Sequence, residues 1–294
     1  MARIQTGVAE ALAIPAIPDE EREFAFSDAD FRSLSQLAYQ HAGIVLAETK
    51  RNLVYSRLSR RLRALGIGSF REYREYLAEN NAEMENFINS ISTNLTKFFR
   101  ESHHFDHLRK NVAATYAKKR PADGRLRVWS AGCSTGEEPH TIGMVLKHEI
   151  HDIHRHDAKI LATDIDTEVV RKASSGLYQM ESLSDVPKEY RSYFTSNGEE
   201  GRKAGVMVDD AVRQLITFRQ LNLLGPWPFR GLFDAIFCRN VMIYFDMPTK
   251  TALIDRFIEQ IKPGGWLYIG HSESLIGSHP KLKIVGRTIY QRTV

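Results

Sequence analysis

The chain has 294 residues, of which 43% are apolar and 26% charged, and its formal net charge is +4. This is ordinary globular composition, and the length allows one large core plus a smaller domain. Two cysteines, Cys133 and Cys238, are too few for a disulfide framework and indicate a reducing compartment. No run approaches the roughly 20 apolar residues of a membrane span, and the N-terminus lacks the apolar stretch of a signal peptide. We therefore expect a cytoplasmic chain without membrane insertion.

The first ninety residues predict a small all-helical domain. We expect a flexible tail over residues 1–22 and the domain itself over 23–92, because helical periodicity begins only after the tail. Its first helix is expected to start at Ser27, which forms an acid-bearing capping box with Asp30, and to end at Gly43. The helical pattern then continues to about residue 91.

The second helix of this domain, expected from about Thr49 to Leu65, carries charge of one sign. Its stretch "KRNLVYSRLSRRLR" (50–63) contains no acid. On a helical wheel the apolar stripe consists of Val54, Leu58, Leu62 and Leu65. A different, cationic face consists of Lys50, Arg57, Arg60 and Arg61. Such a face is often simply solvated, but it also fits an acidic partner such as nucleic acid, lipid or an acidic protein surface.

From residue 125 onward, after a linker over 93–124, apolar strands alternate with helices. The expected strands are "LRVWSAG", "KILATDID", "FDAIFCRNVMIYF", "GGWLYIGHSES" and one or two strands in "LKIVGRTIYQR". Helices in "HTIGMVLKHEI", "TEVVRKASSG" and "PTKTALIDRFIEQIK" separate them. This alternation predicts an α/β fold with a doubly wound, mostly parallel sheet. Over about 176–216 it lapses into a polar, glycine-containing stretch, which predicts a small inserted β-subdomain.

The turn after the first of these strands reads "AGCSTGEEPHT". Gly132 and Gly136 allow a tight turn there, and such a turn before a helix usually binds phosphate. Here the helix opens with Glu137 and Glu138, and a like-charge pair at 4 Å costs on the order of 4 kcal/mol at an effective dielectric near 20. A purely structural alternative is a capping box between Ser134 and Glu137, with Pro139 at the first helical position.

The second strand ends in Asp164 and Asp166, about 30 residues further on. An acid at that position holds ribose hydroxyls in nucleotide-binding sheets. Combined with an acidic helix start, it favours a nucleoside that carries positive charge rather than phosphate. S-adenosylmethionine (SAM), with its sulfonium and α-ammonium groups, has this charge pattern.

Five segments in order along the chain resemble the CheR family of chemotaxis receptor methyltransferases. They are "TNLTKFFRESHHF" (93–105), "STGEEPHT", "TDIDTEVVRKA", "FDAIFCRNVMIYFD" (233–246) and "KPGGWLYIGHSES" (262–274). The resemblance extends over about 26–292. It implies a class I SAM-dependent methyltransferase fold and a protein-glutamate O-methyltransferase that esterifies the helical cytoplasmic bundle of chemoreceptors, releasing S-adenosylhomocysteine.

The resemblance also implies the site residues. At the methionine end and methyl group of SAM they are Asn94, Thr96 and Arg100. Near its amino group lies Glu138, at its ribose Asp164, and on its adenine side Asn222 and Leu223. The strand-exit loop that lines the site contains Arg239, Asn240 and Tyr244. Of these, Arg100 and Tyr244 are expected to orient the substrate carboxylate, which needs no general base because its reference pKa is near 4.3.

For the cationic face, Lys50, Arg57, Arg60 and Arg61, the resemblance implies docking on acidic receptor helices. In some family members the β-subdomain binds a C-terminal receptor peptide by strand addition. The stretch "SNGEEGRKAGV" has different glycine spacing and greater length, so this tether stays open. We expect a monomer with no nucleic-acid partner.

Other patterns in the sequence could suggest a metal site or a nucleophile, but each has a simpler explanation. "KHEIHDIHRH" (147–156) lacks the H-E-x-x-H spacing, and His103 and His107 fit a solvated helix face, so no metal site is expected. We interpret Cys133, Phe98 and Phe99 as packing residues. Two rival functions are a nucleic-acid methyltransferase that uses the basic helix and a non-catalytic SAM-binding adaptor.

Overall fold

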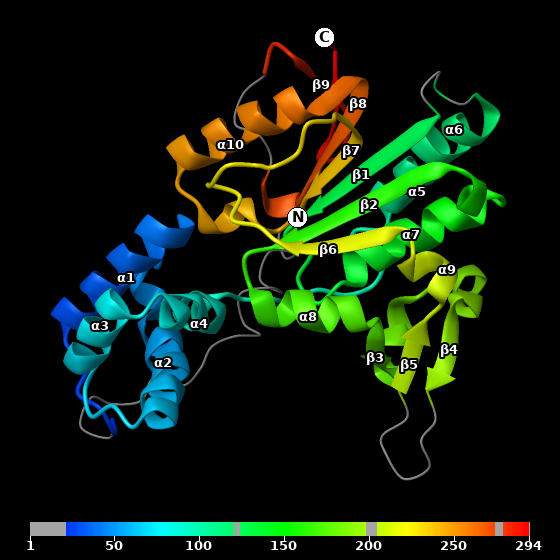
Figure 1. Ribbon diagram of the computed structural model, residues 1–294. Coiled ribbons are helices and arrows are strands. Elements are labelled where there is room, and N and C mark those ends of the chain that lie inside the picture. The colour runs from blue at the N-terminus through cyan, green and yellow to red at the C-terminus, as the bar shows by residue number, and fades with distance from the viewer. Residues whose placement is uncertain (1–21, 120, 122–123, 198–204, 274–278, 294) are drawn as a thin grey trace, which may run out of the picture. The chain divides into compact units, whose positions relative to one another are not determined.

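A computed structural model describes residues 22–119, 121, 124–197, 205–273 and 279–293. They belong to two compact units, Met1–Ser92 and Thr93–Val294 (Figure 1). The tail expected over residues 1–22 lies outside the described residues except for Arg22. Within the described part of the chain, no helix is both long and apolar enough to cross a membrane.

Over residues 22–92, the described part of the first unit, the chain forms four α-helices and one short 3-10 helix. Their bounds are α1 Asp28–Ala42, α2 Arg51–Leu65, α3 Phe70–Glu79, α4 Asn81–Ile91 and the 3-10 helix Glu48–Lys50. The predicted capping box is present, with the Ser27 side chain accepting from the Asp30 N–H and the Asp30 carboxylate accepting from the Ser27 N–H. Gly43 and Gly66 end α1 and α2 in the left-handed conformation. Leu58 and Leu62 of the predicted apolar stripe are fully buried.

Two residues of the predicted cationic face, Arg57 and Arg61, form contacts within the helical unit. Arg57 donates to the carbonyl oxygens of Ser90, Ile91 and Ser92 at 3.3, 3.0 and 2.6 Å, where α4 ends. A cation is favourable there because the last helical carbonyls lack intrahelical partners.

Arg61 forms a two-bond ion pair with Glu83, whose carboxylate is buried and also accepts from the Tyr73 hydroxyl. Lys50 is half-buried, whereas Arg60 is exposed. The interpretation of all four residues as one solvent-facing cationic surface is therefore wrong for Arg57 and Arg61, which hold α2 against α4.

The second unit is built on a seven-stranded sheet of order β6-β2-β1-β7-β8-β10-β9. The strand bounds are β1 Arg125–Ala131, β2 Asp157–Asp164, β6 Ile216–Gln220, β7 Phe233–Cys238, β8 Ile261–Ile269, β9 Leu282–Gly286 and β10 Ile289–Arg292. The first five strands of the order pair in parallel, while β10 is antiparallel to both β8 and β9. The expected doubly wound, mostly parallel sheet is confirmed.

One strand of this sheet differs from the sequence expectation. The sequence predicts no strand over the residues of β6, which begins where the expected insertion ends, yet they pair in parallel with β2, from Ile160–Ile216 to Asp164–Gln220. At the end of the sheet order, β6 has only one neighbouring strand and no fully buried residue. It therefore lacks the continuous apolar run that marks the central strands.

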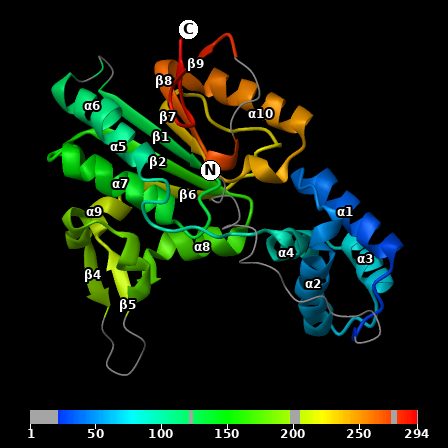
Figure 2. The ribbon, with the colours of Figure 1, turned by 180° about the vertical axis from the view of Figure 1, so that it is seen from behind.

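Helices cover both faces of the sheet, as Figures 1 and 2 show from opposite sides. The bounds are α5 His103–His107, α6 Ala114–Lys118, α7 Glu137–Glu149, α8 Thr167–Ser175, α9 Asp210–Arg213 and α10 Met247–Gln260, with a π-helical turn over Leu108–Ala113. One core joins α7 and the α5–α6 segment to Val128 and Phe237. The other joins α10 to Trp129 and Ile236. Consecutive residues of one strand thus belong to different cores, because successive side chains of a strand point to opposite faces of the sheet.

The inserted β-subdomain is a three-stranded antiparallel sheet of order β3-β5-β4. Its strands are β3 Leu177–Gln179, β4 Phe194–Asn197 and β5 Gly205–Val208, and 3-10 helices over Met180–Asp185 and Lys188–Tyr193 join β3 to β4. The residues 198–204, which contain most of the glycine-rich stretch considered for peptide tethering, lie outside the described residues.

Candidate active site

The predicted site residues come together at one edge of the sheet. β1, β2, β7 and β8 are parallel, so their carboxyl ends, Ala131, Asp164, Cys238 and Ile269, share that edge. From β1 the chain continues to β2 and β6 on one side, and β7 and β8 follow on the other. This reversal beside β1 is the position at which open α/β sheets bind ligands.

The turn between β1 and α7 is tight and conformationally demanding. Gly132 and Gly136 have φ angles of 92° and 96°. A Cβ added to Gly132 would lie 2.2 Å from Val241 Cγ2, and one added to Gly136 would lie 2.7 Å from the Tyr178 hydroxyl oxygen. Ser134 is also left-handed, with φ 48°, at a typical cost of about 1–2 kcal/mol. Glycine is thus required at both positions, because the φ angle is positive and because a neighbouring side chain occupies the space that a Cβ would need.

The helix start differs from the predicted capping box. α7 begins at Glu137, its N-cap is Gly136, and no side chain caps it. Because Ser134 is left-handed, its hydroxyl turns away from the helix and donates to the Asn94 carbonyl at 3.0 Å. Glu137 instead accepts from the Thr135 hydroxyl at 2.6 Å. Pro139 is the third helical residue rather than the first.

Asp164, at the end of β2, binds the turn directly. One carboxylate oxygen accepts from the Ser134 N–H at 2.8 Å and the other from the Asp166 N–H at 3.1 Å. Burial raises the pKa of Asp164 to about 6. Asp166 has a different role, because it caps α8 and accepts from the Asn94 side-chain amide at 2.8 Å. Asn94 therefore bridges the two strand ends through its side chain and its carbonyl.

The segment that follows Asn94 contains the predicted residues Thr96 and Arg100. Phe98 and Phe99 are buried, which confirms their interpretation as packing residues. Thr96 and Arg100 are partly exposed, and Arg100 Nη1 donates to the Leu95 carbonyl at 2.7 Å. A guanidinium has five N–H groups, so this bond leaves donors for a ligand.

Arg239 and Glu138 form a buried ion pair. Arg239 Nη1 lies 2.9 Å from Glu138 Oε2, and the Arg239 side chain is only 2% exposed. Arg239 Nη2 donates to the Arg100 carbonyl, and the Ser130 hydroxyl donates to Glu138 at 2.7 Å. Burial raises the pKa of Glu138, while Arg239 opposes that rise. The acidic helix start expected from the sequence is therefore partly neutralised, because Glu138 has a buried cationic partner in Arg239.

The strand-exit loop is held by a residue that the sequence argument missed. Glu273 accepts from the backbone N–H groups of Asn240 and Gly270, both at 2.7 Å, and of Ile243 at 3.0 Å. Asn240 has a φ of 61°, which these bonds help to maintain. Tyr244, in the 3-10 helix Met242–Tyr244, donates its hydroxyl proton to the Thr93 carbonyl at 3.1 Å. The sequence offered one signal for this residue, because Glu273 is the acid of "GHSES", at the end of a predicted strand.

The expected adenine-side residues follow β6. The Leu221 N–H donates to the Asp164 carbonyl at 2.9 Å, which holds this segment beside the end of β2. Leu223 is 7% exposed and belongs to the core that α10 covers, whereas Asn222 is partly exposed. The Asn222 side-chain oxygen accepts from the Leu224 N–H at 3.0 Å.

Cys133 and the histidines contribute no second centre. Cys133 is buried, and burial raises the pKa of its thiol, which agrees with a packing role. Glu101, His103 and His104 place possible ligand atoms within 4.8 Å of one another. Glu101 Oε2 already lies 3.7 Å from the Arg239 guanidinium, so that carboxylate has a cationic partner and we assign no metal to the group.

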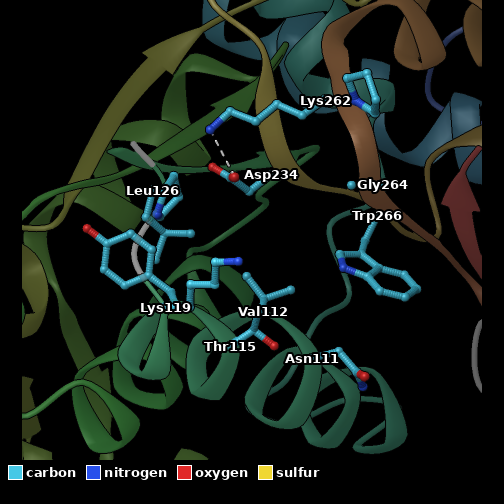
Figure 3. A pocket seen from close by; sticks show the side chains of 13 residues that line it. Asn111, Val112, Thr115, Lys119, Leu126, Asp234, Lys262, Gly264 and Trp266 are labelled. Carbon is cyan, nitrogen blue, oxygen red and sulfur yellow. Dashed lines mark hydrogen bonds and ion pairs between the residues drawn. The ribbon is translucent and has the colours of Figure 1, made fainter. Parts of the chain in front are cut away.

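A pocket of about 190 Å³ lies at the opposite edge of the sheet (Figure 3). Leu126 and Asp234, near the start of β1 and β7, line it together with Lys262 and Trp266 of β8. None of the predicted site residues contributes to it. The Asp234 carboxylate is occupied by Lys262 at 2.9 Å and by the Arg127 N–H at 2.7 Å. This pocket is therefore separate from the site described above.

Comparisons with known proteins agree with this arrangement. Residues 94–291 match the model of the CheR methyltransferase SAM binding domain, and residues 29–92 match its all-alpha domain. A chemotaxis protein methyltransferase of Escherichia coli is 46% identical over 90% of this chain and 91% of its own length. Chemotaxis protein methyltransferase 2 of Pseudomonas aeruginosa is 43% identical over 92% of this chain and 95% of its own length. The chain belongs to the CheR methyltransferase family, and its cofactor is S-adenosylmethionine.

Proposed function

We propose that this enzyme transfers the methyl group of SAM to glutamate side chains on the cytoplasmic helices of chemoreceptors. The observation that supports this most directly is the placement of Arg100. Its partly exposed guanidinium belongs to a segment that is bonded to the Asp164 turn through Asn94 and to the strand-exit loop through Arg239. These bonds support the proposal that Arg100 supplies a cation for an anionic nucleophile.

The residues fit SAM. The Asp164 carboxylate accepts from the backbone N–H groups of Ser134, Asp166 and Ile165, and because a carboxylate has about four acceptor positions it can still bind a ribose hydroxyl. Leu223 offers apolar surface for adenine. Glu137 and the Glu138–Arg239 pair are assigned to the ammonium end. When bound, SAM supplies an electrophilic methyl group on a sulfonium and leaves as the neutral thioether S-adenosylhomocysteine.

The chain's own contribution is orientation. The substrate carboxylate is ionised at neutral pH, so one of its oxygens forms the new O–C bond as the C–S bond breaks, and no proton moves. Arg100 holds that carboxylate through its remaining N–H groups. Tyr244 already donates its proton to Thr93, so it can orient a substrate as a donor only by giving up that bond. The first orienting residue is therefore Arg100.

The helical unit is proposed as the receptor-docking domain. Because Arg57 and Arg61 serve the packing of α2 and α4, the exposed Arg60 is the main candidate for an acidic receptor surface, with Lys50 contributing. Docking of this kind depends on ionic strength, since exposed charges are screened at a distance of about 8 Å in physiological salt.

One assay distinguishes the proposal from its rivals. The enzyme is incubated with methyl-labelled SAM and a receptor cytoplasmic fragment, and the product is treated with mild base. Carboxyl methyl esters release volatile labelled methanol, whereas methylated nucleic-acid amines do not. Base-stable label on DNA or RNA would instead support a nucleic-acid methyltransferase, and SAM binding without transfer would support an adaptor.

A further inference from the structure

We infer that Tyr178 and His140 are positioning residues that hold the SAM-binding turn, so that the inserted β-subdomain is part of the cofactor site. Tyr178 lies on β3 of the subdomain sheet, where it pairs with Val206 of β5. It is 4% exposed, and its hydroxyl donates to the Thr135 carbonyl at 2.9 Å. Thr135 belongs to the turn that carries the Ser134–Asp164 bond, which links the subdomain to the proposed ribose site.

The hydrogen bonds determine which nitrogen of His140 carries the proton. His140 Nδ1 lies 2.8 Å from the Tyr178 hydroxyl oxygen and 2.8 Å from the Gly136 carbonyl oxygen. The single proton of Tyr178 is used on Thr135, and a carbonyl can only accept, so Nδ1 must be the donor to both. The contacts require a proton on Nδ1, and burial, which lowers the pKa of His140 to about 4, favours the neutral form that carries its one proton there.

The result is a chain of donors that ends on the turn. His140 donates to Tyr178, and Tyr178 donates to Thr135. Such chains polarise each member and strengthen the bonds in a buried environment. His140 is fully buried, and its Nε2 has no partner among the described residues, so its polar contacts are directed to Tyr178 and Gly136.

Packing adds a second link between the subdomain and the cofactor-binding segments. Phe98, four residues after Asn94, packs edge-on against Tyr178 at 4.8 Å and against Phe194 of β4 at 5.3 Å between ring centroids. Gly136 has room for no side chain, because an added Cβ would lie 2.7 Å from the Tyr178 hydroxyl oxygen and 2.8 Å from Ala173 Cβ. Both segments proposed to bind SAM thus rest on the side chain of Tyr178.

The test is the affinity for SAM and the turnover of Tyr178→Phe. Loss of one buried hydrogen bond typically corresponds to about a tenfold change in an equilibrium constant. We expect the Kd for SAM, measured by calorimetry, to rise about tenfold, while kcat at saturating SAM changes less than about twofold. The matched control is Tyr116→Phe, which removes a buried hydroxyl bond to the Gly124 carbonyl at 2.7 Å, before β1 begins. It should leave the Kd unchanged.

A second pair of variants separates positioning from folding. His140→Asn keeps an N–H donor near Nδ1 and should retain most of the SAM affinity, whereas His140→Leu should lose about as much as Tyr178→Phe. The inference is overturned if Tyr178→Phe binds SAM as tightly as Tyr116→Phe, or if His140→Asn and His140→Leu bind equally. It rests on the proposed SAM geometry, but the outcomes that overturn it are all values of the Kd for SAM, so failure to methylate receptors would count only against the proposed substrate.

Discussion

The guanidinium of Arg239 lies 2.9 Å from the carboxylate of Glu138, and both residues are less than a tenth exposed. Each comes from a different crossover of the sheet, and the pair also reaches the Arg100 carbonyl. The ion pair therefore joins α7 to the segment that contains Arg100. Its position explains how a site rich in carboxylates can be buried at all, since buried charges require partners.

Replacing one member of this pair should destabilise the fold strongly. Arg239→Met leaves Glu138 buried without its cation, at a cost of about 3–5 kcal/mol in the free energy of unfolding. Urea denaturation measures this cost. In the same background, Glu138→Gln removes the uncompensated charge and should recover part of the loss. If the double variant is no more stable than Arg239→Met alone, the pair does not hold the site together.

Affinity for SAM should depend on pH through Asp164. Burial raises its pKa to about 6, so the carboxyl takes up a proton as the pH falls through 6 and loses acceptor capacity for ribose. Affinity should be constant above about pH 7 and fall by up to about tenfold per pH unit below 6. Calorimetry between pH 5 and 8 measures this. Asp164→Asn should bind weakly throughout and lack the step; a wild-type affinity that stays level down to pH 5 would contradict the assignment.

Arg100→Ala should separate transfer from binding. Loss of an orienting group for the nucleophile typically costs on the order of a hundredfold in rate, whereas SAM itself keeps its other contacts. We expect methyl transfer to fall at least about a hundredfold and the Kd for SAM to change less than about threefold. Lys97→Ala, which removes an exposed cation three residues away, is the control. Equal losses in transfer and binding would remove Arg100 from the orienting role.

Charge reversal on α2 should discriminate docking from folding. Arg60→Glu should raise the KM for a receptor fragment about three- to tenfold at low salt, with little effect at high salt and none on Tm. Arg32→Glu changes an exposed arginine of α1 and serves as the control. Arg57→Glu should instead lower Tm, because it breaks three bonds to the end of α4. A KM that is the same for Arg60→Glu and Arg32→Glu would argue against docking through this face.

The central strands and their helices could be predicted because buried parallel strands contain apolar runs, such as Ala235–Cys238 of β7 and Trp266–Ile269 of β8. β6 could not, since it borders the sheet and has no fully buried residue. Within the site, Asp164 was identifiable from its place after a strand. Glu273 follows a strand, as the signal in "GHSES" shows, but its partners are backbone N–H groups of a loop about thirty residues earlier, and the sequence alone does not identify that contact.

The cationic face of α2 shows the same limit of sequence reasoning. The helical wheel predicts one face that contains Lys50, Arg57, Arg60 and Arg61, of which Lys50 is the N-cap of α2, and it cannot show which of them meet another helix. Glu83, the partner of Arg61, is 22 residues away in the chain and resembles any surface acid until α4 buries it. Long-range partners of polar residues depend on tertiary packing, which periodicity does not encode.

The most direct test of the account is to identify the atom that receives the methyl group. A receptor cytoplasmic fragment is methylated with labelled SAM, and the modified residues are located by mass spectrometry before and after mild base. We predict label on glutamate side chains, its release as methanol, and no labelling at any such position changed to glutamine. Base-stable label on nitrogen, or on residues other than glutamate, would contradict the account.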